Sequence, residues 1–164
     1  MGQRSGNLVR RRKGSRQLVD NMLAERQHVL VLMCEVLGLK PFSADKPVKD
    51  LLSEFNSVLV DYIAAGHFGL YQRIVEGTER RKAVLLKASK VYSQIAESTD
   101  AAVDFNDRYG GTWNFHLLDT LAGDLSALGE KLATRIELED QIISAILGED
   151  AAQAKTPPPR AYIR

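Results

Sequence analysis

The 164-residue sequence has a single cysteine, Cys34, and no hydrophobic run of membrane-spanning length. One cysteine cannot close an internal disulfide, which fits a reducing cytosol. A membrane span needs roughly 18 consecutive apolar residues, and no apolar signal-peptide segment follows the basic N-terminus. We therefore expect a cytoplasmic protein that makes no contact with the membrane.

Motifs that carry common chemistries are also missing. The chain has no cysteine pair, no glycine-rich phosphate loop and no H-E-x-x-H sequence. Di-metal carboxylate bundles need two Glu-x-x-His pairs, and only Glu25 and His28 have that spacing. Cys34 lies in an apolar helical run, where an inert buried thiol is expected. We expect no enzymatic activity, cofactor or metal; a small helical enzyme or metal-binding bundle that uses Asp61, His67 and His28 stays open as the alternative.

Acidic residues are absent before Asp20, so the net charge of +1 is unevenly distributed. The basic residues of this segment are Arg4, Arg10, Arg11, Arg12, Lys13 and Arg16. The rest of the chain has 16 basic and 21 acidic residues, a net charge of −5. A basic arm can touch nucleic acid weakly, but a disordered, solvated arm over residues 1–13 is the simpler expectation. The mildly acidic body suits a basic protein partner better than DNA, so we expect no direct nucleic-acid binding by the body.

Strand patterns, hairpin signals and repeats are absent, and almost every segment after Gly14 has helical periodicity. A first helix is predicted from the cap Ser15 to Gly38 and Pro41, and Pro47 restarts the chain. The second helix is bent or broken at Gly66 and followed by a short helix to Gly77. The third carries the stripe Leu85, Ala88, Tyr92, Ile95, Ala96, Thr99 and Val103 and stops at Gly110-Gly111. The last is predicted from about Asn114 to Leu147, with Leu118 and Ile136 among its inward residues, and Gly148 closes it.

Four long helices with short joins predict an all-α, antiparallel up-and-down four-helix bundle with short additional helices. We expect it to be a monomer. The predicted division is a basic arm over 1–13, a bundle domain over 14–149 and a Pro-rich disordered tail over 150–164.

Two charged residues fall within the inward stripes of their helices. Projection at about 100° per residue places Arg26 among Met22 and Val29, and Glu139 among apolar residues of the last helix. A lone buried charge is too costly, so each needs a partner. We predict that Arg26 and Glu139 meet, or share a cluster with Asp140 and His28; an Arg26 that reaches solvent at the edge of the bundle stays open.

Asp61 lies in the apolar stretch LVDYIAAGHFGLYQRI and projects roughly 130° from the centre of its helix's core stripe. Its outer neighbours are the small or apolar Val60, Ala64, Ala65 and Phe68, where charged residues are usual. A helix that is apolar on nearly all its faces is either buried on both sides or forms a binding surface for another molecule. Protein docking and a local capping role for Asp61 both remain open on the pattern alone.

Four segments resemble one protein family in order and spacing. They are LVDYIAAGHFGLYQRI (59–74), GSRQLVDNMLAERQHVL (14–30), VLGLKP (36–41) and ATRIELEDQII (133–143). Together they resemble the Rsd/AlgQ family, regulators of the primary sigma factor in gamma-proteobacteria. The resemblance implies an all-helical bundle that binds sigma region 4, the basic helix-turn-helix portion that reads the −35 promoter element. Such binding sequesters sigma from core RNA polymerase and favours alternative sigma factors.

The resemblance also implies roles for individual residues. The polar residues that match the family are Asp20, Arg26, His28, Asp61, His67, Glu139 and Asp140. We assign sigma contact to Asp61 and expect Ala65, Phe68, Leu18 and Met22 to belong to the same partner-binding surface. Arg26, His28, His67, Glu139 and Asp140 are assigned to a buried polar cluster or its rim. Met22 stands where enterobacterial members have tryptophan, so the contact there is expected to differ.

Overall fold

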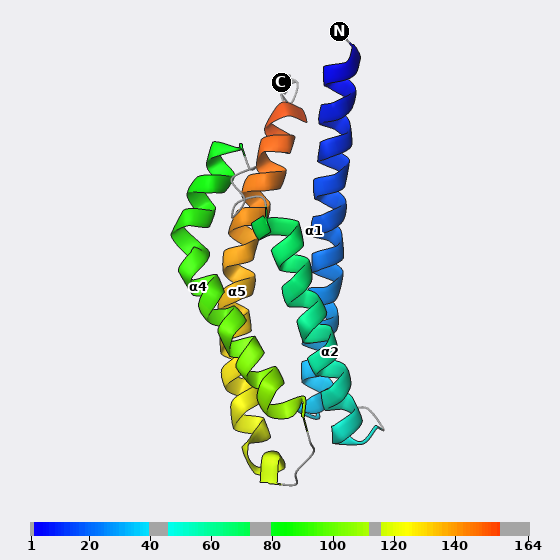
Figure 1. Cartoon of the computed structure of the whole chain (residues 1–164), viewed down its shortest axis with the longest axis vertical. Helices are drawn as coiled ribbons and strands as arrows, with labels where there is room; N and C mark the ends of the chain where they lie inside the picture. Colours follow the sequence, from blue (N-terminus) through cyan, green and yellow to red (C-terminus); the bar gives the residue numbers. More distant parts are fainter. Residues whose placement is uncertain (1, 40–45, 73–79, 112–115, 155–164) are drawn as a thin grey trace, which may run out of the picture.

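The protein is a bundle of four α-helices in this computed structural model, which describes residues 2–39, 46–72, 80–111 and 116–154. The α-helices are α1 (Gly2–Val36), α2 (Val48–Gly66), α4 (Lys82–Tyr109) and α5 (His116–Ala154). A five-residue π-helix, η1 (His67–Tyr71), continues α2. Across the described ranges there is no strand. Successive helices run in opposite directions (Figure 1), which confirms the predicted antiparallel up-and-down bundle.

The bundle consists of two closely packed helical hairpins, α1 with α2 and α4 with α5. Its core is formed by one apolar stripe from each helix, and it includes an edge-to-face pair of Phe55 and Phe105 with ring centroids 5.7 Å apart. Such aromatic pairs add about 0.5–1.5 kcal/mol to the burial of their surface. Leu59 of α2 and Leu125 of α5 are almost completely buried in the same core.

The predicted stop of the first helix at Gly38 is confirmed. Gly38 has a φ of +68°, a conformation that glycine adopts without strain. The amides of Gly38 and Leu39 donate to the carbonyls of Glu35 and Cys34, which closes α1 with a Schellman motif. Pro47 stands at the N-cap of α2, as predicted. Pro41 and the predicted short helix beyond Gln72 lie outside the described residues.

Two helix ends differ from the prediction. Helix α1 begins at Gly2 instead of Ser15, so the backbone of residues 2–13 is helical where we expected a disordered arm. Helix α5 continues through Gly148 to Ala154. Extension of an existing helix is easy, and one interior glycine costs only about 1 kcal/mol. The division into arm, bundle and tail stays a prediction, and residues 155–164 and the predicted start at Asn114 lie outside the described part.

The core stripes of α4 and α5 are shifted by one residue at several positions. On α4 the buried residues are Val84, Ala88, Val91, Ile95, Ser98, Ala102, Phe105 and Tyr109. Tyr92 and Val103, predicted to point inward, are about half exposed. On α5, Leu118 is exposed, and Arg135 and Ile142 are buried more deeply than Ile136. A shift of one residue rotates the stripe by about 100°, which decides what faces the groove described below.

Candidate functional site

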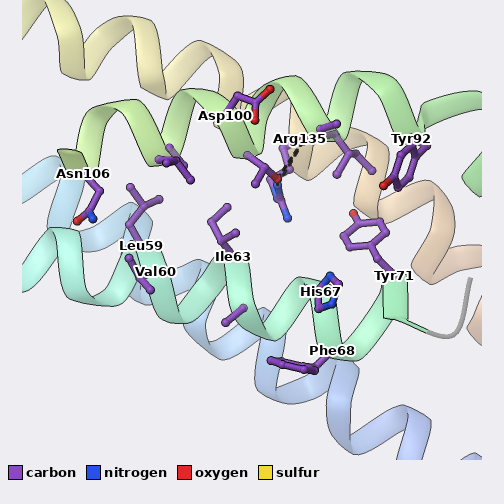
Figure 2. Close-up of a pocket in the computed structure, with 16 residues that line it drawn as sticks. Leu59, Val60, Ile63, His67, Phe68, Tyr71, Tyr92, Asp100, Asn106 and Arg135 are labelled. Atoms are coloured by element: carbon purple, nitrogen blue, oxygen red, sulfur yellow. Dashed lines mark hydrogen bonds between the residues drawn. The ribbon is translucent and has the colours of Figure 1, made fainter. Parts of the chain in front are cut away.

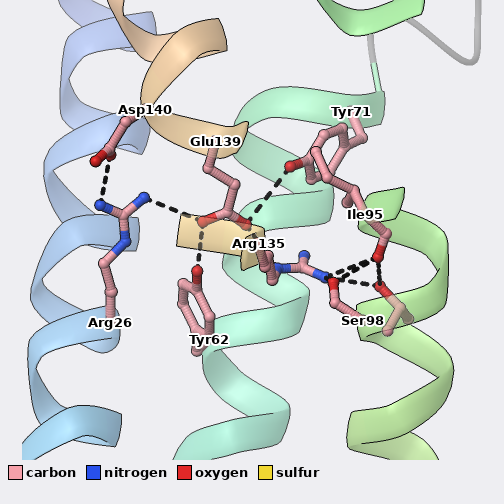
Figure 3. A network of polar contacts seen from close by, with 9 residues as sticks. Arg26, Tyr62, Tyr71, Ile95, Ser98, Arg135, Glu139 and Asp140 are labelled. Atoms are coloured by element: carbon pink, nitrogen blue, oxygen red, sulfur yellow. Dashed lines mark hydrogen bonds and ion pairs between the residues drawn. The ribbon is translucent and has the colours of Figure 1, made fainter. Parts of the chain in front are cut away.

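A buried polar cluster in the middle of the bundle is centred on the carboxylate of Glu139, which has no exposed surface (Figure 3). One oxygen, Oε2, accepts hydrogen bonds from Arg26 Nη2 at 3.1 Å and from the hydroxyl of Tyr62. The other, Oε1, accepts from Arg135 Nε at 2.7 Å and from the Tyr71 hydroxyl at 3.5 Å. Four donors on one carboxylate compensate for much of the cost of burying its charge.

The two arginines extend this cluster to all the α-helices of the bundle. Arg26 of α1 donates through Nη1 to Asp140 Oδ1 at 2.7 Å, at the solvent edge. Arg135, which is 1% exposed, donates through Nη1 to Thr99 Oγ1 at 2.7 Å and to Ser98 Oγ at 3.1 Å, both on α4. The cluster therefore joins α1, α2, α4 and α5 through directional bonds.

The titration of the buried groups follows from this geometry. Burial, together with the negative charge of Glu139, raises the pKa of the Tyr62 and Tyr71 hydroxyls far above their ordinary value. Both tyrosines therefore stay neutral donors to Glu139 throughout the physiological pH range. Burial alone would lower the pKa of Arg26, but its hydrogen bond to Asp140 and its contacts with Tyr62 and Glu139 raise it. Arg26 is thus always a cation here.

Gly66, at the junction of α2 and η1, allows the cluster to approach the α2 backbone. A Cβ atom at this position would lie 3.2 Å from Arg135 Nη2 and 3.4 Å from Glu139 Oε1. Both groups are buried and held by hydrogen bonds, so they have little room to move. The sequence predicted a bend or break at Gly66, whereas the structure keeps the chain helical and makes the glycine a point of close packing.

We expect Gly66→Ala to lower the free energy of unfolding by about 1–2 kcal/mol, because overpacking a rigid site outweighs the gain in helix propensity. Gly123→Ala is the matched control, since Gly123 lies inside α5 with no atom within 4 Å of an added Cβ. That variant should gain up to about 1 kcal/mol. Urea denaturation of both variants tests the contrast, and equal effects of the same sign would contradict it.

The cluster contains three of the five residues that we expected in it. Arg26 and Glu139 are in direct contact, as predicted from their stripes, and Asp140 joins them at the rim. The prediction is wrong for His28 and His67, because both side chains are exposed and neither reaches the cluster. The imidazole of His67 instead packs edge-on against Phe68, with ring centroids 5.2 Å apart.

Arg135 is the charged member of the cluster that the sequence did not predict, and Tyr62 and Tyr71 were not predicted as members either. Arg135 lies four residues before Glu139 and three after Leu132, and all three are buried on one stripe of α5. A stripe drawn through residues 128, 132, 135 and 139 would have found it, whereas the predicted stripe used Ile136. An arginine that is almost completely buried on such a stripe needs an anion or a carbonyl oxygen as a partner for its guanidinium group.

A separate exposed surface surrounds Asp61 on α2. Asp61 and Phe68 are exposed, and Ala65, one turn beyond Asp61, is half-buried between them. Leu18 of α1 is half-buried and its carbonyl oxygen would lie 3.4 Å from a Cβ atom on Gly69, so α1 borders the same region. This Asp61 surface (Asp61, Ala65, Phe68 and Leu18) combines one carboxylate with apolar neighbours.

Met22 does not belong to this surface. We expected it to contact the partner, but its side chain is completely buried in the core. The reason is its place on the inward stripe of α1, three residues after the buried Val19 and seven before Val29. A partner could reach Met22 only if α1 moved away from its neighbours.

No three His, Cys, Asp or Glu side chains among the described residues are placed to hold a metal ion. In the same part of the chain, no helix is long and apolar enough to cross a membrane.

Comparison with known proteins identifies the family of the chain. Residues 1–147 match the family model described as "Regulator of RNA polymerase sigma(70) subunit, Rsd/AlgQ". The chain is also similar to two proteins called "Regulator of sigma D". One is from Escherichia coli O139:H28 (strain E24377A / ETEC), and the other is from Shigella boydii serotype 18 (strain CDC 3083-94 / BS512). Each is 36% identical over 155 residues, which cover 92% of this chain and 96% of the relative. The chain, with its helical bundle and buried polar cluster, therefore belongs to the Rsd/AlgQ family.

Proposed function

We propose that this protein regulates transcription by binding region 4 of the primary sigma factor through the Asp61 surface. Bound region 4 would be withheld from core RNA polymerase and from −35 promoter DNA, which leaves more polymerase for alternative sigma factors. Membership of the Rsd/AlgQ family supports the sigma factor as partner. The relatives' name, "Regulator of sigma D", supports the same class of partner.

The single observation that carries the choice of surface is the exposed carboxylate of Asp61 beside exposed Phe68 and half-buried Ala65. A helix-turn-helix that reads DNA presents arginines and lysines to the phosphates. A carboxylate in a partly apolar setting binds such a cation strongly once water is excluded. The acidic net charge of the chain after its basic first segment also attracts a basic partner.

Binding, and not catalysis, is the proposed mode of action. His28, Asp61 and His67 are each exposed on the surface, and no described group of carboxylates, imidazoles and thiols could hold a metal ion. The most deeply buried carboxylate, that of Glu139, has its oxygens occupied by four donors from the protein itself. Its geometry is that of a structural group.

The test is calorimetric titration of the purified protein with region 4 of the primary sigma factor. We expect saturable binding that releases a fluorescent −35 promoter fragment from region 4, because the Asp61 surface and the DNA would compete for the same cationic face of region 4. Region 4 of an alternative sigma factor is the matched control and should bind at least tenfold more weakly, a difference of about 1.4 kcal/mol. Equal binding of both domains, or a stable ternary complex with the DNA, would contradict the proposal.

A further inference from the structure

A second surface feature adjoins the Asp61 surface on α2 and shares Phe68 with it. It is a groove of about 570 Å³ between α2 with η1 on one side and α4 on the other (Figure 2). Ile63, His67 and Tyr71 project from α2 and η1 toward α4. Ligand pockets commonly enclose about 300–1,000 Å³. The groove is therefore large enough to receive several side chains of a partner.

Exposed apolar side chains gather along this groove. Val60 and Phe68 on one side are 49% and 57% exposed, and Tyr92 and Val103 on the other are 50% and 49% exposed. These four, the apolar rim, are nearly half of the nine large hydrophobic residues exposed in the described chain. Scattered exposed hydrophobics need no explanation, but a contiguous set on both sides of a groove indicates an interaction site.

The floor of the groove gives no preference for an anion. Its charged member is Arg135, whose guanidinium is already bound to Glu139 at 2.7 Å and to Thr99 at 2.7 Å. The remaining floor is apolar, with Leu59 and Ile95 almost completely buried. Affinity in the groove must therefore come from apolar side chains, and any charge preference from its edge.

The edge formed by α4 is acidic. Asp100 lines the groove, and Asp104 and Asp107 follow it at four and seven residues, so the three carboxylates form one stripe along the helix. All three are exposed, and none forms an ion pair with a residue of the described chain. An acidic stripe beside an apolar groove is complementary to a helix with basic residues flanking an apolar face.

We propose that the groove between α2 and α4 is a second docking site, which takes a basic amphipathic helix of a partner protein. Tyr92 and Val103 are eleven residues apart on α4, about 16 Å along the axis. An amphipathic helix places anchors at positions i, i+3 or i+4, and i+7 within that length. Its lysines or arginines then lie over the acidic stripe. The proposal goes beyond the sigma surface and does not depend on it.

The test measures binding of a synthetic leucine–lysine amphipathic helix of about 14 residues, about 21 Å long, to the full chain by fluorescence anisotropy. The same helix with glutamate in place of lysine is the control probe. Val103→Lys places a cation at the apolar rim and should weaken binding of the basic helix at least tenfold. Leu86→Lys is the matched variant: Leu86 is 57% exposed on the same helix but does not line the groove, so binding should not change.

The sigma site is monitored separately. Asp61→Ala should leave binding of the basic helix unchanged, and Val103→Lys should leave binding of sigma region 4 unchanged. Equal binding of the lysine and glutamate helices, or equal losses in Val103→Lys and Leu86→Lys, would overturn the proposal. So would loss of sigma binding in Val103→Lys, which would make the groove part of the sigma surface. A groove that bound an apolar dye but neither helix would be a small-molecule site, and this too would overturn it.

Discussion

Asp61→Ala is expected to weaken binding of sigma region 4 by roughly 30-fold to several thousand-fold, because truncating one member of a desolvated charge pair costs about 2–5 kcal/mol. The side chain is exposed and forms no hydrogen bond or ion pair with another residue of the described chain. Its replacement therefore removes no polar contact among these residues. Helical content and the melting temperature should stay close to those of the wild type, which separates a binding defect from a folding defect.

The measurement is calorimetric titration with region 4 at two salt concentrations. A charge pair that forms at an interface contributes less when salt screens its surroundings, so the difference between wild type and Asp61→Ala should shrink as salt is raised. Glu130→Ala is the matched control, because Glu130 is an exposed acid on α5 outside the Asp61 surface. Normal sigma binding by Asp61→Ala, or an equal loss in Glu130→Ala, would remove the docking role of Asp61.

Glu139→Gln is expected to lower the free energy of unfolding by about 3–5 kcal/mol, the usual cost of removing one charge from a buried ion pair. Two guanidinium groups, of Arg26 and Arg135, lose their shared anion in this variant. Glutamine keeps the size of the side chain, so no cavity confounds the result. An amide also brings its own donors close to Tyr62 and Tyr71, whose hydroxyls need an acceptor.

Urea denaturation followed by circular dichroism measures this cost. Asp140→Asn is the matched control, since Asp140 bonds the same Arg26 but its side chain is 56% exposed. It should cost no more than about 1 kcal/mol, as is typical of exposed ion pairs. Because Glu139 is buried away from the Asp61 surface, the folded fraction of Glu139→Gln should bind sigma normally. A cost for Glu139→Gln as small as that for Asp140→Asn would show that the cluster contributes little to stability.

The sequence by itself determined the helices and much of their inward faces. Apolar periodicity and the helix-end signals at Gly38, Pro47 and Gly110 depend on the local backbone, so they can be identified without the tertiary structure. The contact between Arg26 and Glu139 was also predictable, because two opposite charges on inward stripes must find partners.

Only the tertiary structure decided which neighbouring stripe faces the core. Successive residues of a helix are about 100° apart around its axis, so a shift of the core stripe by one residue changes which side chains are buried. In this way packing exposed Tyr92 and Val103 and buried Arg135 in place of Ile136. The same choice placed Tyr92 and Val103 along the groove. Arg135 can be buried because its donors meet acceptors of α4, which lie 36 and 37 residues away in the chain. His28 and His67 have no such acceptors in the cluster and stay exposed, because burying a polar group without hydrogen bonds is costly.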